Sequence, residues 1–287
     1  MNKYFIFACL SILVLGQISA IAGLDLNNQK ELDTTFKESM NDFTHSVFIE
    51  ECTATWCPNC PYCAEALYNM YHSEDYDFSF VALIHDVNPN AKIRLDEFTM
   101  GMYKGYAFPT TYFDGGIFNI VGRGSTAAQT ESMYRDIIED VGSREVNQPI
   151  ELNTNVEWLD DAEIRVNIEV TNNGNGIYFG KIRSYITEIE SRWNNYDGDP
   201  YHYGFLDFAI NKIIFLLPGK TQSISVEWDG KEDHNGISFE DIVKENINVI
   251  TTLSHWKPVM KTGYESNTFT QKYLAFAVDQ THSSIPE

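Results

Sequence analysis

Residues 51–63 have the sequence Glu51-Cys52-Thr53-Ala54-Thr55-Trp56-Cys57-Pro58-Asn59-Cys60-Pro61-Tyr62-Cys63. A short strand is expected before this stretch (46–51), and a helix is expected from residue 60 to residue 71. The first thiol of the Cys57-x-x-Cys60 motif then stands at a strand-to-helix junction, where free N–H groups and the helix dipole stabilise a thiolate. The second thiol follows three residues later and can close a small disulfide. An activated thiol beside a resolving thiol is the arrangement that thiol–disulfide exchange needs.

The cysteines are concentrated in this one stretch. The chain has five in 287 residues, and the four beyond Cys9 all lie within residues 52–63. A secreted fold held by disulfides spreads its cysteines to close long loops, so a cluster indicates thiol chemistry or a metal site. Four thiolates are enough for zinc or an iron–sulfur cluster, and this alternative stays open. Cys52 and Cys63 have two other interpretations, as buried apolar side chains or as a regulatory pair, with Cys63 bonding to Cys52 or Cys60.

The Trp56-Cys57-x-x-Cys60 run after a strand resembles the thioredoxin superfamily. A distant second motif, Phe108-Pro109-Thr110-Thr111-Tyr112-Phe113-Asp114-Gly115-Gly116, is similar to the cis-proline loop of that family. The resemblance covers about residues 40–145. It implies that Cys57 is the nucleophile, Cys60 the resolving thiol and Trp56 the flanking aromatic residue. It also implies that Pro109 is the cis-proline beside the disulfide and that Glu51 is the buried acid that relays protons. The overlapping Cys60-Pro61-Tyr62-Cys63 run resembles glutaredoxin-type sites, but it starts inside the helix, so Cys57 is the expected attacker.

The N-terminus has the pattern of an export signal (1–22). Lys3 precedes an apolar segment (4–16), and Ala20-Ile21-Ala22 is a small-residue cleavage site. An uncleaved membrane anchor is the competing interpretation, because residues 4–22 nearly reach bilayer-spanning length. Cleavage would leave an exported protein in the periplasm, outside the cell or on its surface. Contact with a membrane is expected only if this segment is retained.

Two different patterns divide the rest of the chain. Residues 23–146 alternate helical and strand segments, including helices at 29–43 and 91–103 and a buried strand at 78–85, which indicates a mixed sheet with flanking helices. Residues 147–287 alternate apolar and polar positions between turns, which is typical of an antiparallel β-sandwich, here Ig-like. The expected fold class is therefore an α/β thioredoxin-like domain followed by a β-sandwich domain. The boundary is expected near Asn147-Gln148-Pro149.

Charge and motifs limit the partners. The formal net charge of −21 argues against nucleic acid, and no nucleotide-binding glycine motif follows a strand, so no cofactor and no bound metal is expected. The expected function is an exported thiol–disulfide oxidoreductase that acts on protein or peptide thiols. Because Glu50 and Glu51 oppose a strongly activated thiol, a reductase or isomerase is favoured over a powerful oxidant. A non-catalytic surface or binding protein that retains the scaffold is the alternative, as is a four-cysteine metal-binding protein.

Overall fold

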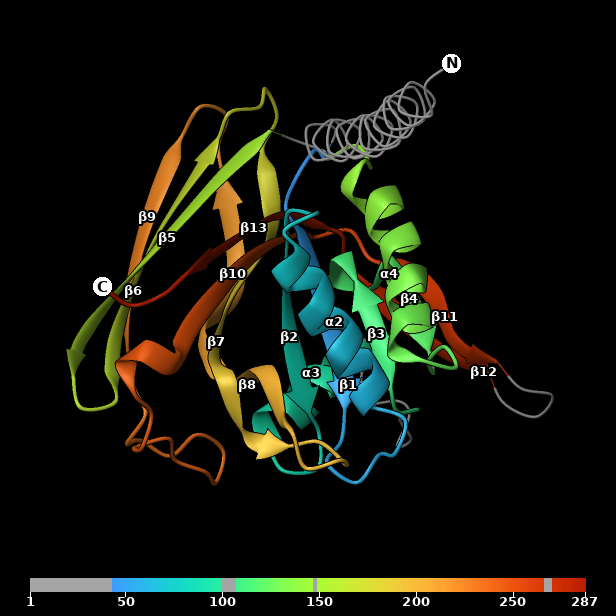
Figure 1. Ribbon diagram of the computed structural model, residues 1–287. Coiled ribbons are helices and arrows are strands. Elements are labelled where there is room, and N and C mark those ends of the chain that lie inside the picture. The colour runs from blue at the N-terminus through green and yellow to red at the C-terminus, as the bar shows by residue number, and fades with distance from the viewer. Residues whose placement is uncertain (1–42, 100–106, 147–148, 266–269) are drawn as a thin grey trace, which may run out of the picture. The chain divides into compact units, whose positions relative to one another are not determined.

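The computed structural model describes residues 43–99, 107–146, 149–265 and 270–287 (Figure 1). Its helices and strands are, in chain order, β1 (Val47–Thr53), α2 (Pro61–Ser73), β2 (Phe78–Ile84), α3 (Pro89–Thr99), β3 (Thr110–Phe113), η1 (Asp114–Gly116), β4 (Phe118–Val121), α4 (Ala127–Gly142), β5 (Ile150–Asp160), β6 (Glu163–Asn172), β7 (Tyr178–Asn194), β8 (Pro200–Leu216), β9 (Thr221–Asp229), η2 (Lys244–Asn246), β10 (Ile247–His255), β11 (Val259–Glu265), β12 (Thr270–Ala275) and β13 (Val278–Ser284).

Strand β1 lies at the centre of the part that carries the cysteines. It pairs in parallel with β2, with Glu51 opposite Ala82, and antiparallel with β3, with Cys52 opposite Thr110. Alternate side chains of β1 point to opposite faces of the sheet, as in any strand. Val47 and Ile49 pack against α2 and α4, whereas Phe48 packs toward α3 and β12. Figure 1 shows α2 and α4 in front of these strands and α3 behind them.

The second half of the chain continues the same sheet. Strand β8 pairs in parallel with β2 at Ala82 and Gly204. Strand β7 then pairs with β8, β10 with β7, and β13 with β10, all antiparallel. The result is one eight-stranded sheet in the order β13-β10-β7-β8-β2-β1-β3-β4.

The expected fold class, an α/β thioredoxin-like domain followed by a β-sandwich domain, is wrong. The structure is predominantly β, and the strands assigned to a separate sandwich domain extend the sheet that carries the cysteines. The helix and strand periodicities are local signals, which reveal which segments are strands but not which strands become neighbours. Most of the expected helices and strands are therefore found close to the residue ranges expected for them, but the strands pair differently from what was expected.

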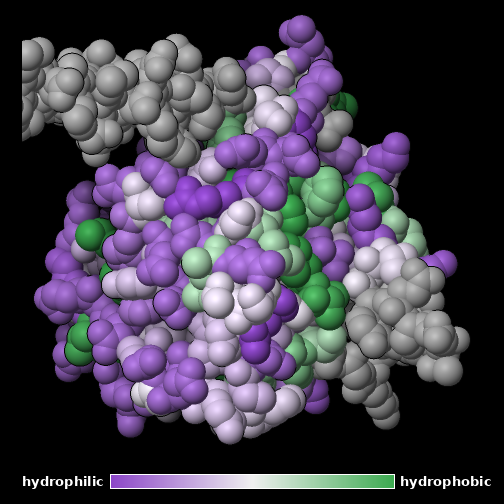
Figure 2. All heavy atoms as spheres, turned by 45° about the vertical axis from the view of Figure 1, so that its right-hand side comes forward, coloured by the Kyte–Doolittle hydropathy of each residue, from purple (hydrophilic) through white to green (hydrophobic). Residues whose placement is uncertain are grey.

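A smaller sheet covers part of the large one. Strands β5, β6 and β9 form a three-stranded antiparallel sheet whose apolar side chains pack against those of β7, β8 and β10. Strands β11 and β12 form a separate hairpin. The surface that faces the viewer in Figure 2 is mostly hydrophilic, with apolar side chains gathered in a strip to the right of its centre. The apolar side chains shared by the three-stranded sheet and by β7, β8 and β10 lie between the two sheets.

Some expectations concern residues that lie outside the described ones. These are the export signal (1–22), most of the helix expected at 29–43, the end of the helix expected at 91–103, and residues 147–148 at the expected domain boundary. Within the described part of the chain, no helix combines the length and the apolar character needed to cross a bilayer.

Candidate functional site

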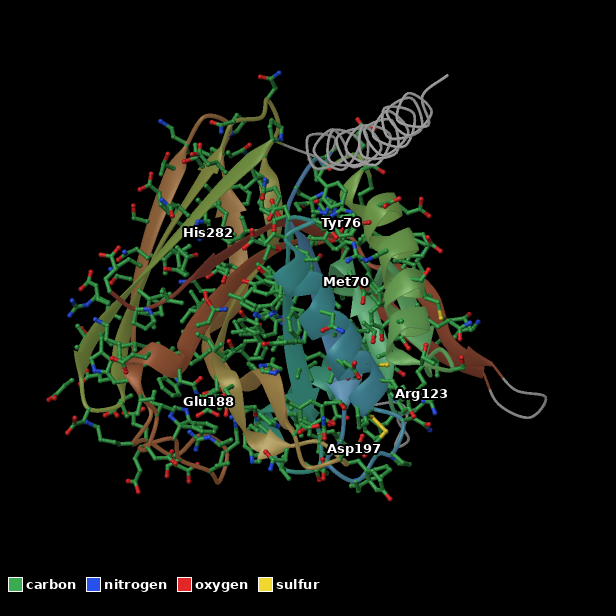
Figure 3. All side chains as sticks on the ribbon, in the orientation of Figure 1. Met70, Tyr76, Arg123, Glu188, Asp197 and His282 are labelled. Atoms are coloured by element: carbon green, nitrogen blue, oxygen red, sulfur yellow. A yellow bond between two sulfur atoms is a disulfide. The ribbon has the colours of Figure 1, made fainter. Side chains whose placement is uncertain are left out.

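The site lies in the loop that joins β1 to α2. Cys57 and Cys60 form a disulfide with a Cα–Cα distance of 5.4 Å. Pro61 is the first residue of α2 and Cys60 is its N-cap, so the motif stands immediately before the helix. The loop is held by hydrogen bonds from the Cys57 N–H to the Ala54 carbonyl (3.2 Å) and from the Cys60 N–H to the Cys57 carbonyl (3.2 Å). Figure 3 shows the disulfide as a yellow bond at the lower end of α2.

The two bonded cysteines differ slightly in their exposure to solvent. Cys57 is 2% exposed and Cys60 is fully buried, and both pack with Ala54 and the half-buried Phe108. Trp56 is 59% exposed, and its ring meets the Phe108 ring edge-on at a centroid distance of 5.6 Å. The Trp56 and Phe108 rings thus form an aromatic pair beside the disulfide.

Pro109 stands at the start of β3, on the strand next to the one that precedes the disulfide. The Phe108–Pro109 peptide bond is cis, which is the conformation that the sequence resemblance implies. The Pro109 carbonyl accepts a hydrogen bond from the Gly122 N–H (2.8 Å), which ties the loop to the end of β4. Because Phe108 packs with Cys57 and Cys60, the structure brings the two distant sequence motifs together.

Glu51 lies behind the loop, buried on the face of the sheet that α2 and α4 cover. It is 0% exposed, and neither of its carboxylate oxygens has a hydrogen-bond partner among the described residues. Burial raises the pKa of Glu51 to about 8, and the nearby Thr53 hydroxyl offsets only part of that rise. A carboxyl group with a pKa near neutrality can both donate and accept a proton under working conditions.

The two remaining cysteines of the cluster lie on opposite faces of the sheet. Cys63 packs among the residues between the sheet and α2, and Cys52 packs on the α3 side. Both are free and buried. Burial, reinforced by the charge of Glu51, raises the pKa of the Cys63 thiol to about 12, and burial likewise raises the pKa of Cys52. A Cys52–Cys63 disulfide would have to pass through the sheet. Among the described residues, no three His, Cys, Asp or Glu side chains come close enough together to hold a metal ion.

Arg123 is a site residue that the sequence analysis missed. Its Nε donates to Oδ1 of Asn59, between the two bonded cysteines (3.0 Å), and its guanidinium lies 3.7 Å from the centre of the Tyr62 ring. Figure 3 labels Arg123 beside the disulfide. No motif in the sequence links residue 123 to residue 59, because the contact depends on where β4 ends relative to α2.

The two acids before the motif have separate environments. Glu50 points to the α3 face, where Arg94 binds both of its oxygens (2.7 and 2.8 Å), so its charge is neutralised away from the disulfide. Only Glu51 of the two adjacent glutamates therefore faces α2.

Asp86, which follows β2, holds the loop before Trp56. Its carboxylate accepts hydrogen bonds from the backbone N–H and the side-chain hydroxyl of Thr55.

Comparisons with known proteins concern the fold alone. No protein-family model matches the chain, and no curated protein matches it either. A solved structure, HBP35 of Porphyromonas gingivalis, is similar with a TM-score of 0.54 and 14% sequence identity, over 85% of this chain and 76% of that one. A protein from Agrobacterium tumefaciens has a TM-score of 0.47 at 13% identity, over 85% and 95% of the two chains, which is too low to carry an argument. The fold of this chain, with the large mixed sheet described above, is thus similar to that of HBP35.

Proposed function

We propose that this protein is an exported thiol–disulfide oxidoreductase that acts on protein or peptide thiols, as a reductase or isomerase. The observation that carries the proposal is the Cys57–Cys60 disulfide, placed just before a helix and packed against the Phe108 that precedes cis-Pro109. The buried carboxyl group of Glu51 behind it, which has no hydrogen-bond partner in the described part of the chain, supports the same chemistry. The proposal agrees with the resemblance of this segment to the thioredoxin superfamily.

The reductase direction begins with the dithiol form. The Cys57 thiolate attacks one sulfur of a substrate disulfide, the substrate S–S bond breaks, and the other substrate sulfur leaves as a thiolate that takes up a proton. Cys60 then loses its proton and attacks the Cys57 sulfur. The mixed disulfide breaks, the second substrate sulfur leaves, and the Cys57–Cys60 bond forms again. Two electrons pass from the two cysteines to the substrate, and an external thiol reductant restores the dithiol.

Glu51 is the proposed carrier of the Cys60 proton. Its side chain lies on the face of the sheet that α2 covers, and α2 begins directly after Cys60. With a pKa of about 8, the carboxylate can take a proton from one thiol and return it to a leaving thiolate. Arg123 adds a positive charge beside the same motif, which favours the thiolate.

The test is reduction of insulin by the purified protein with a thiol reductant, using three cysteine variants. We expect Cys57→Ser to abolish turnover and Cys60→Ser to accumulate mixed disulfides, visible on non-reducing gels and located by mass spectrometry at Cys57. Cys63→Ser is the matched control, because it removes a buried thiol from the same helix, and it should keep activity within about twofold. A wild-type protein without insulin reduction, isomerase activity or trapped adducts would favour the non-catalytic binding alternative.

A further inference from the structure

A cavity of about 370 Å³ lies away from the cysteine site. Residues of α3, η1, β7, β8 and β12 line it, together with Trp256, just after β10. One of its lining residues is Gly115, which follows the end of β3, whereas Pro109 and the disulfide lie at the start of that strand. The cavity volume is within the range of about 300–1,000 Å³ that small-molecule sites have.

The wall of this cavity is largely apolar. Phe98 of α3 forms a buried part of it, and Phe179 packs beside Trp256 with a ring-centroid distance of 5.9 Å. Ile213 and Trp256 remain 66% and 52% exposed, so large apolar side chains stand at the edge without cover from the described residues. An aliphatic or aromatic group that filled the cavity would remove this surface from water.

One end of the cavity carries an excess of positive charge. Arg183, Lys181 and Arg94 all lie within 3.3 Å of the Glu97 carboxylate. Burial opposes ionisation of Glu97, but the three cations outweigh it and lower its pKa to about 2, so Glu97 is charged. Arg94 also binds both oxygens of Glu50. Even counted against both Glu50 and Glu97, the three cations leave one positive charge at this end of the cavity, in a chain whose net charge is −21.

Arg183 and Lys181 are two of the cations that line the cavity itself. Arg183 is 5% exposed, and Lys181 is half-buried. A carboxylate head group at this end would balance the remaining positive charge and accept charge-assisted hydrogen bonds from these two side chains.

We propose that this cavity binds a small amphiphilic carboxylate, whose head group pairs with the cations Arg183 and Lys181 and whose apolar chain lies along Phe98, Phe179 and Trp256. The site is independent of the cysteine chemistry and shares no residue with it. Its ligand class is that of medium-chain fatty acids.

The test uses three eight-carbon probes of equal length. Tryptophan fluorescence and calorimetry measure the binding of each probe to the protein. Octanoate is the anion, octan-1-ol is neutral, and octylamine is the cation. We expect saturable 1:1 binding of octanoate, about tenfold tighter than that of octan-1-ol because of the hydrogen bond to a charged donor, and weaker binding of octylamine. The absence of saturable octanoate binding, or tightest binding of octylamine, would overturn the proposal.

Two variants locate the site. Arg183→Met should remove the preference for octanoate over octan-1-ol, and Ile213→Glu, at the exposed edge of the cavity, should weaken octanoate at least tenfold. Ile285→Glu is the matched control, because Ile285 is 61% exposed and lies outside the cavity lining. If Arg183→Met fails to fold, Ile213→Glu and the probe series still decide. Octanoate binding that is the same in Ile213→Glu and in the wild type would place the ligand elsewhere and refute the proposal.

Discussion

At the scale of single residues, Glu51 stands out, because its carboxyl group is fully buried without a hydrogen-bond partner among the described residues. Such a group is expected to lower stability once it is ionised. In the proposed function this carboxyl group carries the proton of Cys60. A perturbed pKa of a buried group is common at functional sites.

Glu51→Gln should raise the stability of the protein by an amount that depends on pH. Above pH 4.5 the carboxyl group is ionised in the unfolded chain but stays protonated in the folded protein up to about pH 8, so the wild type loses stability as the pH rises through this window. The variant lacks this loss. Urea denaturation should show its advantage growing on the order of 4 kcal/mol between pH 5 and pH 8. Glu65→Gln, exposed on α2, is the control, and parallel pH profiles of Glu51→Gln and wild type would contradict the burial argument.

Arg123 makes a second prediction at this scale. Its guanidinium contacts the residue between the two cysteines, and a nearby positive charge increases the fraction of a thiol that is ionised. In the reduced protein, Arg123→Met should slow the alkylation of Cys57 by iodoacetamide about threefold to tenfold at neutral pH. Arg135→Met removes an arginine that binds Asp75 and Glu131 instead, and it should leave this rate unchanged. If both variants slowed the alkylation of Cys57 equally, the cause would be the change in the net charge of the protein and not the contact of Arg123 with the motif.

At the scale of elements, β1, the loop after it and α2 place the four clustered thiols in different environments. Cys52 lies on the α3 face, Cys63 on the α2 face, and Cys57 and Cys60 in the loop beyond the end of the strand. A single strand and the first turn of one helix thus place neighbouring cysteines of the sequence in different environments. Only the loop pair is bonded and adjacent to an exposed aromatic side chain.

Alkylation of the native, oxidised protein tests this separation. Cys52 and Cys63 should remain unlabelled by iodoacetamide, because both thiols are buried and their pKa values are raised. Both should become labelled in urea, as peptide mass spectrometry would show. Recovery of a Cys52–Cys63 disulfide from the native protein would contradict the placement of these two residues on opposite faces of the sheet.

At the scale of the whole described unit, the pairing of β2 with β8 joins the cysteine-bearing strands to the long strands of the second half. Gly204 lies at this contact, opposite Ala82. A Cβ added at Gly204 would meet the side chain of Ser191, with 2.7 Å to the Ser191 Cβ. Residues 43–287 also form one compact unit by their internal contacts. Both halves of the sheet should therefore unfold together.

Gly204→Val should destabilise both halves by about 1–3 kcal/mol, because the added side chain cannot fit at the junction without displacing its neighbours. Hydrogen exchange monitored by mass spectrometry should show β1 and β10 losing protection by the same free energy. Ser223→Val, exposed on β9, is the control. Loss of protection in only one half, or two separate unfolding transitions, would mean that the halves fold as independent domains.

The sequence by itself determined the local features of this protein. The Cys57-x-x-Cys60 spacing after an apolar strand and the alternating segments of the second half each depend on neighbours within a few residues, and they are found where they were expected. The tertiary structure alone decided that β2 pairs with β8, what each acid and thiol of the segment packs against, and that Arg123 meets Asn59. Those outcomes depend on packing and on pairing partners far apart in the chain, and the period of a single strand carries no record of its neighbour.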